Sequence, residues 1–260
     1  MMINKKIGVF DSGVGGLTVL KGLHERLSNE TFIYIGDNKH SPYGEKTYEQ
    51  LLEYTTKIVE YFIKEDVKMI VLACNTTSCT VLEELRQRYP QVPILGVTEA
   101  TCQWINQDQP KQVLVMATNA TIQSQAYQTR IGLDKTIGVA CPQLVPLIEN
   151  AATKEEIDEE LKRLLTQPIQ DCDSVVLGCT HYPIVASNIA ELFPNVKLYS
   201  SSDAIVEEVN RYLDTHNLHN TTNEKSKVYT TGNLQKFIES ASAFFNFKNY
   251  DVQWLDVEVE

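Results

Sequence analysis

Residues 69–78 read MIVLACNTTS, and residues 174–183 read SVVLGCTHYP. Each segment is an apolar run of strand length that ends in a small residue and a cysteine, with polar residues directly after it. Each is preceded, about sixty residues earlier, by a strand that ends in a polar turn, IGVFDSG at residues 7–13 and VLVMATNAT at residues 113–121. This order predicts two similar halves that face one another, each offering one cysteine to a shared cleft. Because apolar strands resemble one another, chance similarity stays open as the alternative.

The rest of the chain alternates short apolar runs with amphipathic stretches. Residues 48–63, for example, place Leu51, Ile58 and Phe62 at near-helical spacing among polar neighbours. Such alternation is typical of βα units, so we expect an α/β fold with mostly parallel sheets flanked by helices. The expected strands are Ile7–Phe10, Phe32–Ile35, Met69–Ala73, Ile94–Val97, Val113–Ala117, Ile137–Ala140, Val175–Leu177, Val196–Tyr199 and a weaker Val228–Tyr229.

Composition and charge exclude several classes of protein. The 260 residues suffice for one large or two ordinary α/β domains. No apolar run approaches the ~20 residues of a membrane helix, and the run before Asp11 is too short for a secretory signal, so we expect a cytoplasmic protein without a membrane partner. The net charge of −11, without a Lys or Arg cluster, argues against nucleic acid as a partner. The six cysteines are then expected to be reduced.

Cys74 stands beyond the carboxyl end of an expected strand, where functional residues gather in α/β folds. We expect a helix to follow it, with Asn75, Thr76 or Thr77 as the N-cap. The helix N-terminus would make this setting electropositive and so lower the pKa of the thiol. A buried cysteine that only fills space is the alternative.

Cys179 has the same setting with a more distinctive surround. Gly178 allows close backbone approach, Thr180 supplies a hydroxyl group, and His181 supplies a titratable imidazole. Pro183 fits the first turn of a following helix. An accidental Cys-His pair is the alternative, but the parallel placement of the two cysteines weakens it for both.

The other cysteines, Cys79, Cys102, Cys141 and Cys172, are expected to be packing residues. None of the six forms a CxxC pair or a ligand pattern with the five histidines, so we expect no bound metal.

The segment DSGVGG at residues 11–16 looks like a phosphate-binding loop but lacks the residues of one. A P-loop would end in Gly-Lys-Ser/Thr, and the dinucleotide motif GxGxxG would need glycine at Thr18. The glycines instead favour close approach to a small ligand or another domain, with Asp11 and Ser12 at the tip. Asp11 as a simple helix cap is the alternative.

Two cysteines on opposite walls of one cleft suit the inversion of an α-carbon without a cofactor. One group removes the proton from one face, and the other delivers a proton to the opposite face. Cysteine can alternate between thiolate and thiol near neutral pH, while Asp11, Glu149 or His181 hold or shuttle protons. Helix N-termini behind Ser12, Asn75-Thr76 and Thr180 are expected to bind the substrate carboxylate.

Five segments in register resemble bacterial glutamate racemase over nearly the whole chain. They are DSGVGG, PYG at residues 42–44, ACNT at residues 73–76, CPQLVPLIE at residues 141–149 and GCTHYP at residues 178–183. The resemblance implies a cofactor-independent isomerase that interconverts L- and D-glutamate and supplies D-glutamate for peptidoglycan. It assigns Cys74 to D-glutamate and Cys179 to the L-form. A homodimer is also expected.

The resemblance also implies an architecture and a set of site residues. Two similar domains, residues 1–97 with 209–260 and residues 98–208, would be related by a pseudo-twofold axis around a central cleft. The implied catalytic residues are Cys74, Cys179, Asp11, His181 and Glu149. The implied substrate contacts are Asp11, Ser12, Pro42, Tyr43, Gly44, Asn75, Thr76, Thr118, Thr121, Thr180 and His181.

This chain departs from the usual sequence of the family at two places. Thr77-Ser78-Cys79 replaces the usual Ala-Ser-Ala, and Met-Ala-Thr ends the strand before residue 119 where Leu-Gly-Thr is usual.

Three other functions are alternatives to glutamate racemisation. A cysteine hydrolase or amidotransferase would leave one of the strand-end cysteines unexplained. A non-catalytic ligand-binding module would need neither of them. Aspartate racemase is the nearest rival in chemistry, and the set of motifs disfavours it.

Overall fold

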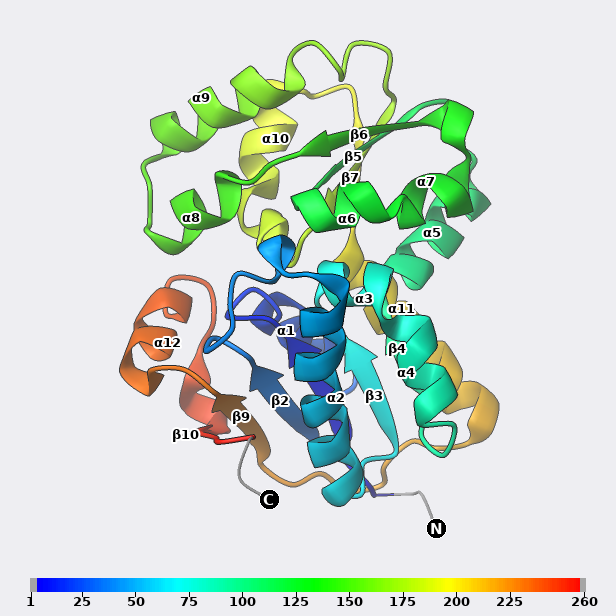
Figure 1. The fold of residues 1–260 in the computed structure, drawn as a ribbon, viewed down its shortest axis with the longest axis vertical. Coiled ribbons are helices and arrows are strands. Elements are labelled where there is room, and N and C mark those ends of the chain that lie inside the picture. Colours follow the sequence, from blue (N-terminus) through cyan, green and yellow to red (C-terminus); the bar gives the residue numbers. More distant parts are fainter. Residues whose placement is uncertain (1–3, 258–260) are drawn as a thin grey trace.

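The computed structural model describes residues 4–257, which form two lobes, one above the other in Figure 1. The lower lobe holds a six-stranded sheet in the order β10-β9-β2-β1-β3-β4, and the upper lobe a four-stranded sheet in the order β6-β5-β7-β8. All neighbouring strands run parallel, which confirms the expected α/β class. The strands are β1 (Ile7–Asp11), β2 (Phe32–Gly36), β3 (Met69–Leu72), β4 (Ile94–Gly96), β5 (Val113–Ala117), β6 (Thr136–Ala140), β7 (Ser174–Gly178), β8 (Lys197–Ser200), β9 (Ser226–Thr230) and β10 (Tyr250–Trp254).

The nine strands expected from the apolar runs are all present, and their ends differ from expectation by at most two residues. The strand β10 was not expected. Its sequence, YDVQW, mixes polar with apolar residues because it lies at the edge of the lower sheet, where Trp254 is 56% exposed. Edge strands bury fewer side chains and therefore carry a weaker hydrophobic pattern.

Helices cover both faces of the lower sheet, and the strand side chains alternate between two cores. Ile7 and Val9 pack with α1 and α11 (Ser201–His216), whereas Phe10 packs with α2 and α4. Gly8 allows α2 to lie close to β1, since a Cβ there would be only 2.8 Å from the Phe62 ring. The helices of this lobe are α1 (Leu17–Arg26), α2 (Tyr48–Lys64), α3 (Asn75–Thr80), α4 (Leu82–Arg88) and α12 (Leu234–Ala241).

The helix α2 confirms the one expected at residues 48–63. Thr47 caps its N-terminus by accepting a hydrogen bond from the backbone N–H of Gln50, whose side chain accepts one from the Thr47 backbone in return. Leu51, Ile58 and Phe62 lie on its buried face, as their spacing predicts.

The upper lobe repeats the same construction around fewer strands. Leu114 and Met116 pack on one side with α8, α9 and α10, and Val113 and Val115 pack on the other side with α5 (Val97–Asp108) and α7. The helices here are α6 (Asn119–Ser124), α7 (Ala126–Ile131), α8 (Leu144–Glu149), α9 (Lys154–Leu165) and α10 (Ala186–Leu192). Short 3-10 helices are η1 (Tyr43–Glu45), η2 (Leu133–Lys135), η3 (Tyr182–Val185) and η4 (Phe247–Asn249).

Two helices, α5 (Val97–Asp108) and α11 (Ser201–His216), join the lobes. Ala100 of α5 belongs to a lower core and Ile105 to an upper one, while Val209 of α11 belongs to the lower core. The expected limits between residues 97 and 98 and between 208 and 209 fall within these helices, and all strands lie on the expected sides of them. The domain limits themselves stay a prediction.

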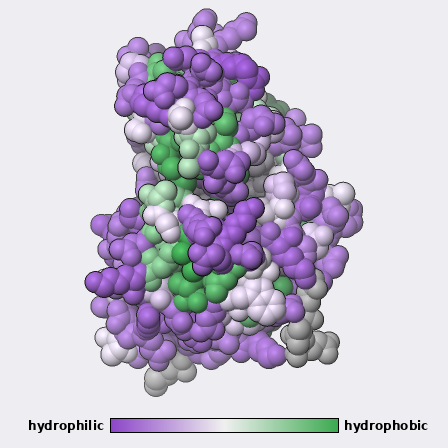
Figure 2. Space-filling model, turned by 90° about the vertical axis from the view of Figure 1, so that its left-hand side faces the viewer, coloured by the Kyte–Doolittle hydropathy of each residue, from purple (hydrophilic) through white to green (hydrophobic). Residues whose placement is uncertain are grey.

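The surface in Figure 2 is mostly hydrophilic, with hydrophobic residues gathered near the level where the lobes meet. Among residues 4–257, no helix combines the length and the apolar character that crossing a membrane requires.

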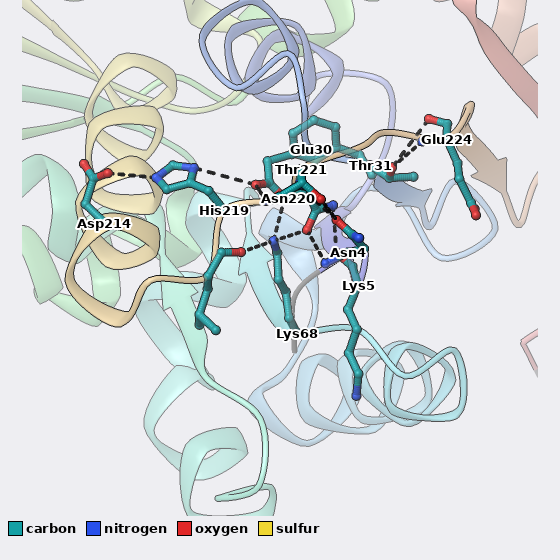
Figure 3. A network of polar contacts seen from close by, with 12 residues as sticks. Asn4, Lys5, Glu30, Thr31, Lys68, Asp214, His219, Asn220, Thr221 and Glu224 are labelled. Atoms are coloured by element: carbon teal, nitrogen blue, oxygen red, sulfur yellow. Dashed lines mark hydrogen bonds and ion pairs between the residues drawn. The ribbon is translucent and has the colours of Figure 1, made fainter. Parts of the chain in front are cut away.

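The segment that returns from α11 to β9 is anchored by a buried ion pair (Figure 3). Lys68 Nζ lies 2.6 Å from Glu30 Oε2, and neither side chain is more than 1% exposed. The same ammonium group donates hydrogen bonds to the Leu218 carbonyl (2.6 Å) and to Asn220 Oδ1 (2.7 Å). Glu30 in turn accepts a hydrogen bond from the Asn220 backbone N–H at 2.8 Å. The pair therefore ties the returning chain to the start of β3 and the loop before β2.

Replacing Lys68 by Met is expected to lower the free energy of unfolding by about 3–5 kcal/mol, because the variant leaves the Glu30 carboxylate buried without its counter-charge. The matched control is Arg88→Met, which removes an exposed ion pair to Glu84 on α4 and should cost about 0–1 kcal/mol. Urea unfolding followed by circular dichroism measures both. Equal losses in the two variants would contradict the structural role of the buried pair.

Candidate active site

A cavity of about 480 Å³ lies between the lobes, at the carboxyl ends of the central strands. Both cysteines expected to react line this cavity, and a larger hollow of about 980 Å³ between α1, α5 and α11 is lined by none of the expected site residues. The expected residues that line the smaller cavity are Ser12, Pro42, Tyr43, Gly44, Cys74, Asn75, Thr76, Thr118, Glu149, Cys179, Thr180 and His181. Asp11 and Thr121 do not line it, since both are fully buried behind it.

The two cysteines occupy equivalent places in the two sheets. The order β2-β1-β3-β4 in the lower sheet has the same form as β6-β5-β7-β8 in the upper sheet, so β3 corresponds to β7. Cys74 follows β3 with one residue between, and Cys179 follows β7 directly. The internal repetition read from the sequence is therefore present in the topology.

The loop after β1 packs directly on the loop that carries Cys179. A Cβ on Gly15 would lie 2.4 Å from His181 Nδ1 and 2.5 Å from Thr180 Oγ1, so only glycine fits there. Thr180 Oγ1 donates a hydrogen bond to Asp11 Oδ1 at 3.2 Å, and Thr18 Oγ1 donates one to the Thr180 carbonyl at 3.0 Å. Gly15 of DSGVGG thus serves the close approach of the other lobe, whereas Gly16 lies against Asp11 and Tyr34 of its own lobe.

A corresponding contact joins the Cys74 loop to the loop after β5. Thr76 Oγ1 lies 3.0 Å from Thr118 Oγ1 and 3.5 Å from Thr121 Oγ1. A Cβ on Gly44 would lie 2.9 Å from the Thr118 Cβ, which brings η1 against the same loop. Each cysteine loop is therefore held by the first loop of the opposite lobe.

Cys74 is 5% exposed and differs in two ways from what its sequence setting predicts. It is itself the N-cap of α3, without a side-chain capping bond, so the expectation of Asn75, Thr76 or Thr77 as the cap was wrong. Burial and the nearby Asp11 carboxylate raise the pKa of Cys74 to about 12, although its hydrogen bond to Ser12 Oγ (3.5 Å) acts in the opposite direction. The expected lowering was therefore wrong, because desolvation outweighs the effect of a helix of only six residues.

Cys179 belongs to a chain of three polar groups. Its sulfur lies 3.8 Å from His181 Nδ1, and His181 Nε2 lies 2.9 Å from Glu149 Oε1. Burial lowers the pKa of His181, but the interactions with Cys179 and Glu149 outweigh it and raise this pKa to about 10. The pKa of Glu149 is lowered, since the contacts with His181 and the charge of Lys236 outweigh the effect of burial. His181 thus lies between the Glu149 carboxylate and the Cys179 sulfur, and both contacts favour its imidazolium form.

Asp11 supports the site from behind the cavity wall. Its carboxylate accepts hydrogen bonds from the Gly13 backbone N–H (3.1 Å) and from Thr180 Oγ1. Burial raises its pKa, and the neighbouring His181 charge opposes that rise. Asp11 is not the N-cap of α1, which is Gly16, so the helix-cap alternative is wrong.

Two of the three helix N-termini expected to bind the substrate carboxylate do not lie at the expected residues, Ser12 and Thr180. The helix α1 begins at Leu17, five residues after Ser12, and the segment after Thr180 is the short 3-10 helix η3. Pro183 does stand in the first turn of η3, as expected. Of the three expected N-termini, the one at Asn75 and Thr76 opens an α-helix at the cavity. Thr118 and Asn233, which also line the cavity, cap α6 and α12.

Several residues at the site were not expected from the sequence. Lys236 and Phe237 of α12 line the cavity, although they follow the second cysteine by more than fifty residues and share no motif with it. Asp37 is buried beneath Tyr43, whose hydroxyl donates a hydrogen bond to it, and Thr231 donates another at 2.6 Å. The YIGD run at residues 34–37, a strand that ends in a carboxylate, was the available indication.

The remaining cysteines pack as expected, with one at the cavity edge. Cys102 and Cys141 are buried, Cys79 and Cys172 are half-buried, and Cys141 also lines the cavity. Within residues 4–257, no three His, Cys, Asp or Glu side chains are grouped so that they could hold a metal ion.

The sequence matches known proteins over its full length. Residues 7–209 match the family model of Asp/Glu/hydantoin racemases. The chain is 38% identical, over 97% of both chains, to glutamate racemase of Carboxydothermus hydrogenoformans, and 38% identical, over 99% of both, to that of Thermoanaerobacter pseudethanolicus.

Solved structures agree with this assignment. A glutamate racemase isoform of Bacillus anthracis is 31% identical and superposes with a TM-score of 0.92, covering 98% of this chain and 99% of that one. The Francisella tularensis glutamate racemase, solved in complex with D-glutamate, is 31% identical with a TM-score of 0.91 and covers 98% of both chains. The chain therefore belongs to the Asp/Glu/hydantoin racemase family and, within it, to the glutamate racemases.

Proposed function

We propose that this chain interconverts L- and D-glutamate by a two-base mechanism in which Cys74 and Cys179 act on opposite faces of the α-carbon. One observation carries the proposal: the two thiols follow equivalent strands of two similar lobes and line a single cavity. A hydrolase needs one such cysteine, and a binding module needs none. Inversion of the α-carbon by this mechanism needs two cysteines, one for each face.

In the L-to-D direction, the Cys179 thiolate takes the α-proton and becomes a thiol. The Cys74 thiol then gives its own proton to the opposite face of the planar carbanion and becomes a thiolate. The D-to-L direction reverses both transfers. The high pKa of Cys74 supports a resting state in which this residue is a thiol and therefore ready to act as the acid.

His181 and Glu149 assist proton transfer at Cys179. A positive charge on His181, 3.8 Å from the Cys179 sulfur, stabilises negative charge that develops there. Glu149 keeps the imidazole charged and oriented through its 2.9 Å contact with Nε2. Asp11 and Ser12 have the corresponding position beside Cys74, where Ser12 contacts the sulfur directly.

Proton transfer alone contributes about 10²–10⁴-fold, so the carbanion also needs electrostatic stabilisation. Backbone and side-chain donors of Asn75, Thr76 and Thr180 at the cavity are the groups proposed to hold the α-carboxylate, onto which the charge spreads. The remaining substrate contacts are proposed to come from Ser12, Tyr43-Gly44 and the threonines of the β5 loop.

The wider role follows from the family. We propose that the D-glutamate enters peptidoglycan synthesis, in the cytoplasm, and that the enzyme works as a homodimer. These statements rest on the resemblance to glutamate racemases.

Cys74→Ser and Cys179→Ser are each expected to lower kcat/KM about 10²–10⁴-fold in both directions, because a serine hydroxyl is a far weaker acid than a thiol. Circular dichroism of glutamate measures the rate. Cys172→Ser, in the upper lobe and outside the cavity, is the control and should keep wild-type turnover. Wild-type turnover in either of the first two variants would refute the two-base mechanism.

Racemisation in D₂O is expected to place deuterium at the α-carbon of the product enantiomer, while early in the reaction the remaining substrate keeps its hydrogen. The reason is that the proton donor on the far face exchanges with solvent before it reacts. Proton NMR after separation of the enantiomers measures this. A cysteine hydrolase would give no exchange, and faster turnover of aspartate than of glutamate would reassign the substrate.

Glu149→Gln is expected to destabilise the protein most between pH 4.5 and 6.5. The raised pKa of His181 contributes stability that is complete below its ordinary value of 6.5 and is lost as the pH rises through about 10. The lowered pKa of Glu149 contributes stability that is complete above its ordinary value of 4.5 and is lost as the pH falls through its lower value in the folded protein. Urea unfolding of wild type and variant across this pH range measures the difference. A difference that grows from pH 6.5 to 10 would contradict the ion pair, and Glu83→Gln on the exposed face of α4 is the control.

A further inference from the structure

We propose that Tyr127 and Ser201 are positioning residues that hold the Asn75 amide in one orientation, so that it offers an N–H group to an anionic substrate beside Cys74. This inference rests on the proposed function, and it adds two residues from outside the sequence motifs to the same site.

The three side chains form a short buried network at the junction of the lobes. Asn75, the first residue of α3, is 3% exposed and lines the cavity. The Tyr127 hydroxyl, from α7 in the upper lobe, donates a hydrogen bond to Asn75 Oδ1 at 2.6 Å. Asn75 Nδ2 donates to Ser201 Oγ, at the start of α11, at 3.1 Å. Tyr127 and Ser201 are both fully buried, so no water competes for these bonds.

The direction of the network is fixed by a backbone carbonyl. Ser201 Oγ lies 3.4 Å from the Leu177 carbonyl oxygen, which can only accept a hydrogen bond. Ser201 has one hydrogen, and the carbonyl takes it, so the serine oxygen must accept from the asparagine amide. The nitrogen of Asn75 therefore faces Ser201, and its oxygen faces the Tyr127 hydroxyl. A flipped amide would put its oxygen against the Ser201 oxygen, so that the single serine hydrogen could serve only one of two acceptors, Asn75 Oδ1 and the Leu177 carbonyl.

This orientation decides what Asn75 offers the cavity. Its Nδ2 atom has two hydrogens, of which Ser201 accepts one, and no side chain or carbonyl within the described part of the chain accepts the other. Its oxygen is already engaged by Tyr127. The uncommitted group is thus a donor, which suits a carboxylate, and an amide free to turn would expose its oxygen for part of the time and repel the same anion.

The network also connects the two cysteine segments. Asn75 directly follows Cys74, and Leu177 precedes Cys179 by two residues on β7. The Tyr127 ring is held in the core around β5 with Cys102 and Ile105. The position of the donor beside one thiol is therefore set by the core of the opposite lobe.

Tyr127→Phe tests the inference, because it keeps the ring and removes only the hydroxyl. We expect both KM and the dissociation constant for D-glutamate to rise about three- to tenfold, the worth of one hydrogen bond. The turnover number kcat should also fall, since the same donor holds the carboxylate onto which the carbanion charge spreads. Titration calorimetry measures the dissociation constant without turnover. Ser201→Ala should weaken binding similarly, and the double variant should bind about as weakly as either single one, since both act through one amide.

Tyr199→Phe is the matched control. Tyr199 is a second buried tyrosine of the upper lobe, its hydroxyl donates to Asp108 at 2.8 Å, and it does not line the cavity. We expect it to lose similar thermal stability and to keep wild-type binding. Unchanged binding in Tyr127→Phe, or equal weakening in Tyr199→Phe, would overturn the inference. If wild type itself neither binds nor racemises glutamate, the proposed function fails instead, which is a separate outcome.

Discussion

The close packing of the Gly13–Gly16 loop on the Cys179 loop is the constraint on which the site depends. Where Gly15 meets His181 there is no room for a single added carbon, so the Gly15 backbone lies directly against the His181 and Thr180 side chains of the other lobe. The corresponding contacts of Thr76 and Gly44 with Thr118 fix the other side. Parallel sheets place their reactive loops at one edge, and two such edges pressed together leave a cavity whose walls each carry one thiol.

The two halves are similar in topology but differ in the groups behind each thiol. His181 and Glu149 stand behind Cys179, whereas the residue at the position equivalent to His181 is Thr76, and the charged neighbour of Cys74 is the buried Asp11. The enantiomers have equal free energies, so this asymmetry cannot change the equilibrium between them. It does bear on which thiol holds the proton in the resting protein. The raised pKa of Cys74 and the positive charge of His181 beside the other thiol both favour a resting state in which Cys74 is protonated.

The strands and the paired cysteines could be predicted because they depend on local patterns: apolar runs, the polar residues after them and their spacing. Properties that depend on burial could not. The helix after Cys74 was expected to lower its pKa, but the sequence does not reveal that Asp11 is buried nearby or that the helix is only six residues long. Lys236 and Tyr127 were missed for a related reason, since each reaches the site through packing between elements far apart in the chain. The edge strand β10 was missed because the polar residues Asp251 and Gln253 interrupt its apolar residues.

A net charge of −11 by itself disfavours an anionic ligand, yet charges more than about 8 Å away are largely screened at physiological ionic strength. Recognition is therefore decided by the groups that touch the ligand. Around this cavity those groups are mostly neutral, and the ionisable side chains His181 and Lys236 are balanced by Glu45 and Glu149. A neutral donor attracts a carboxylate only when its hydrogen points at it, so orientation matters more here than net charge. For Asn75 that orientation comes from Tyr127 and Ser201. In the proposed site, substrate binding therefore depends on the same packing between the lobes that places the two thiols on opposite walls of the cavity.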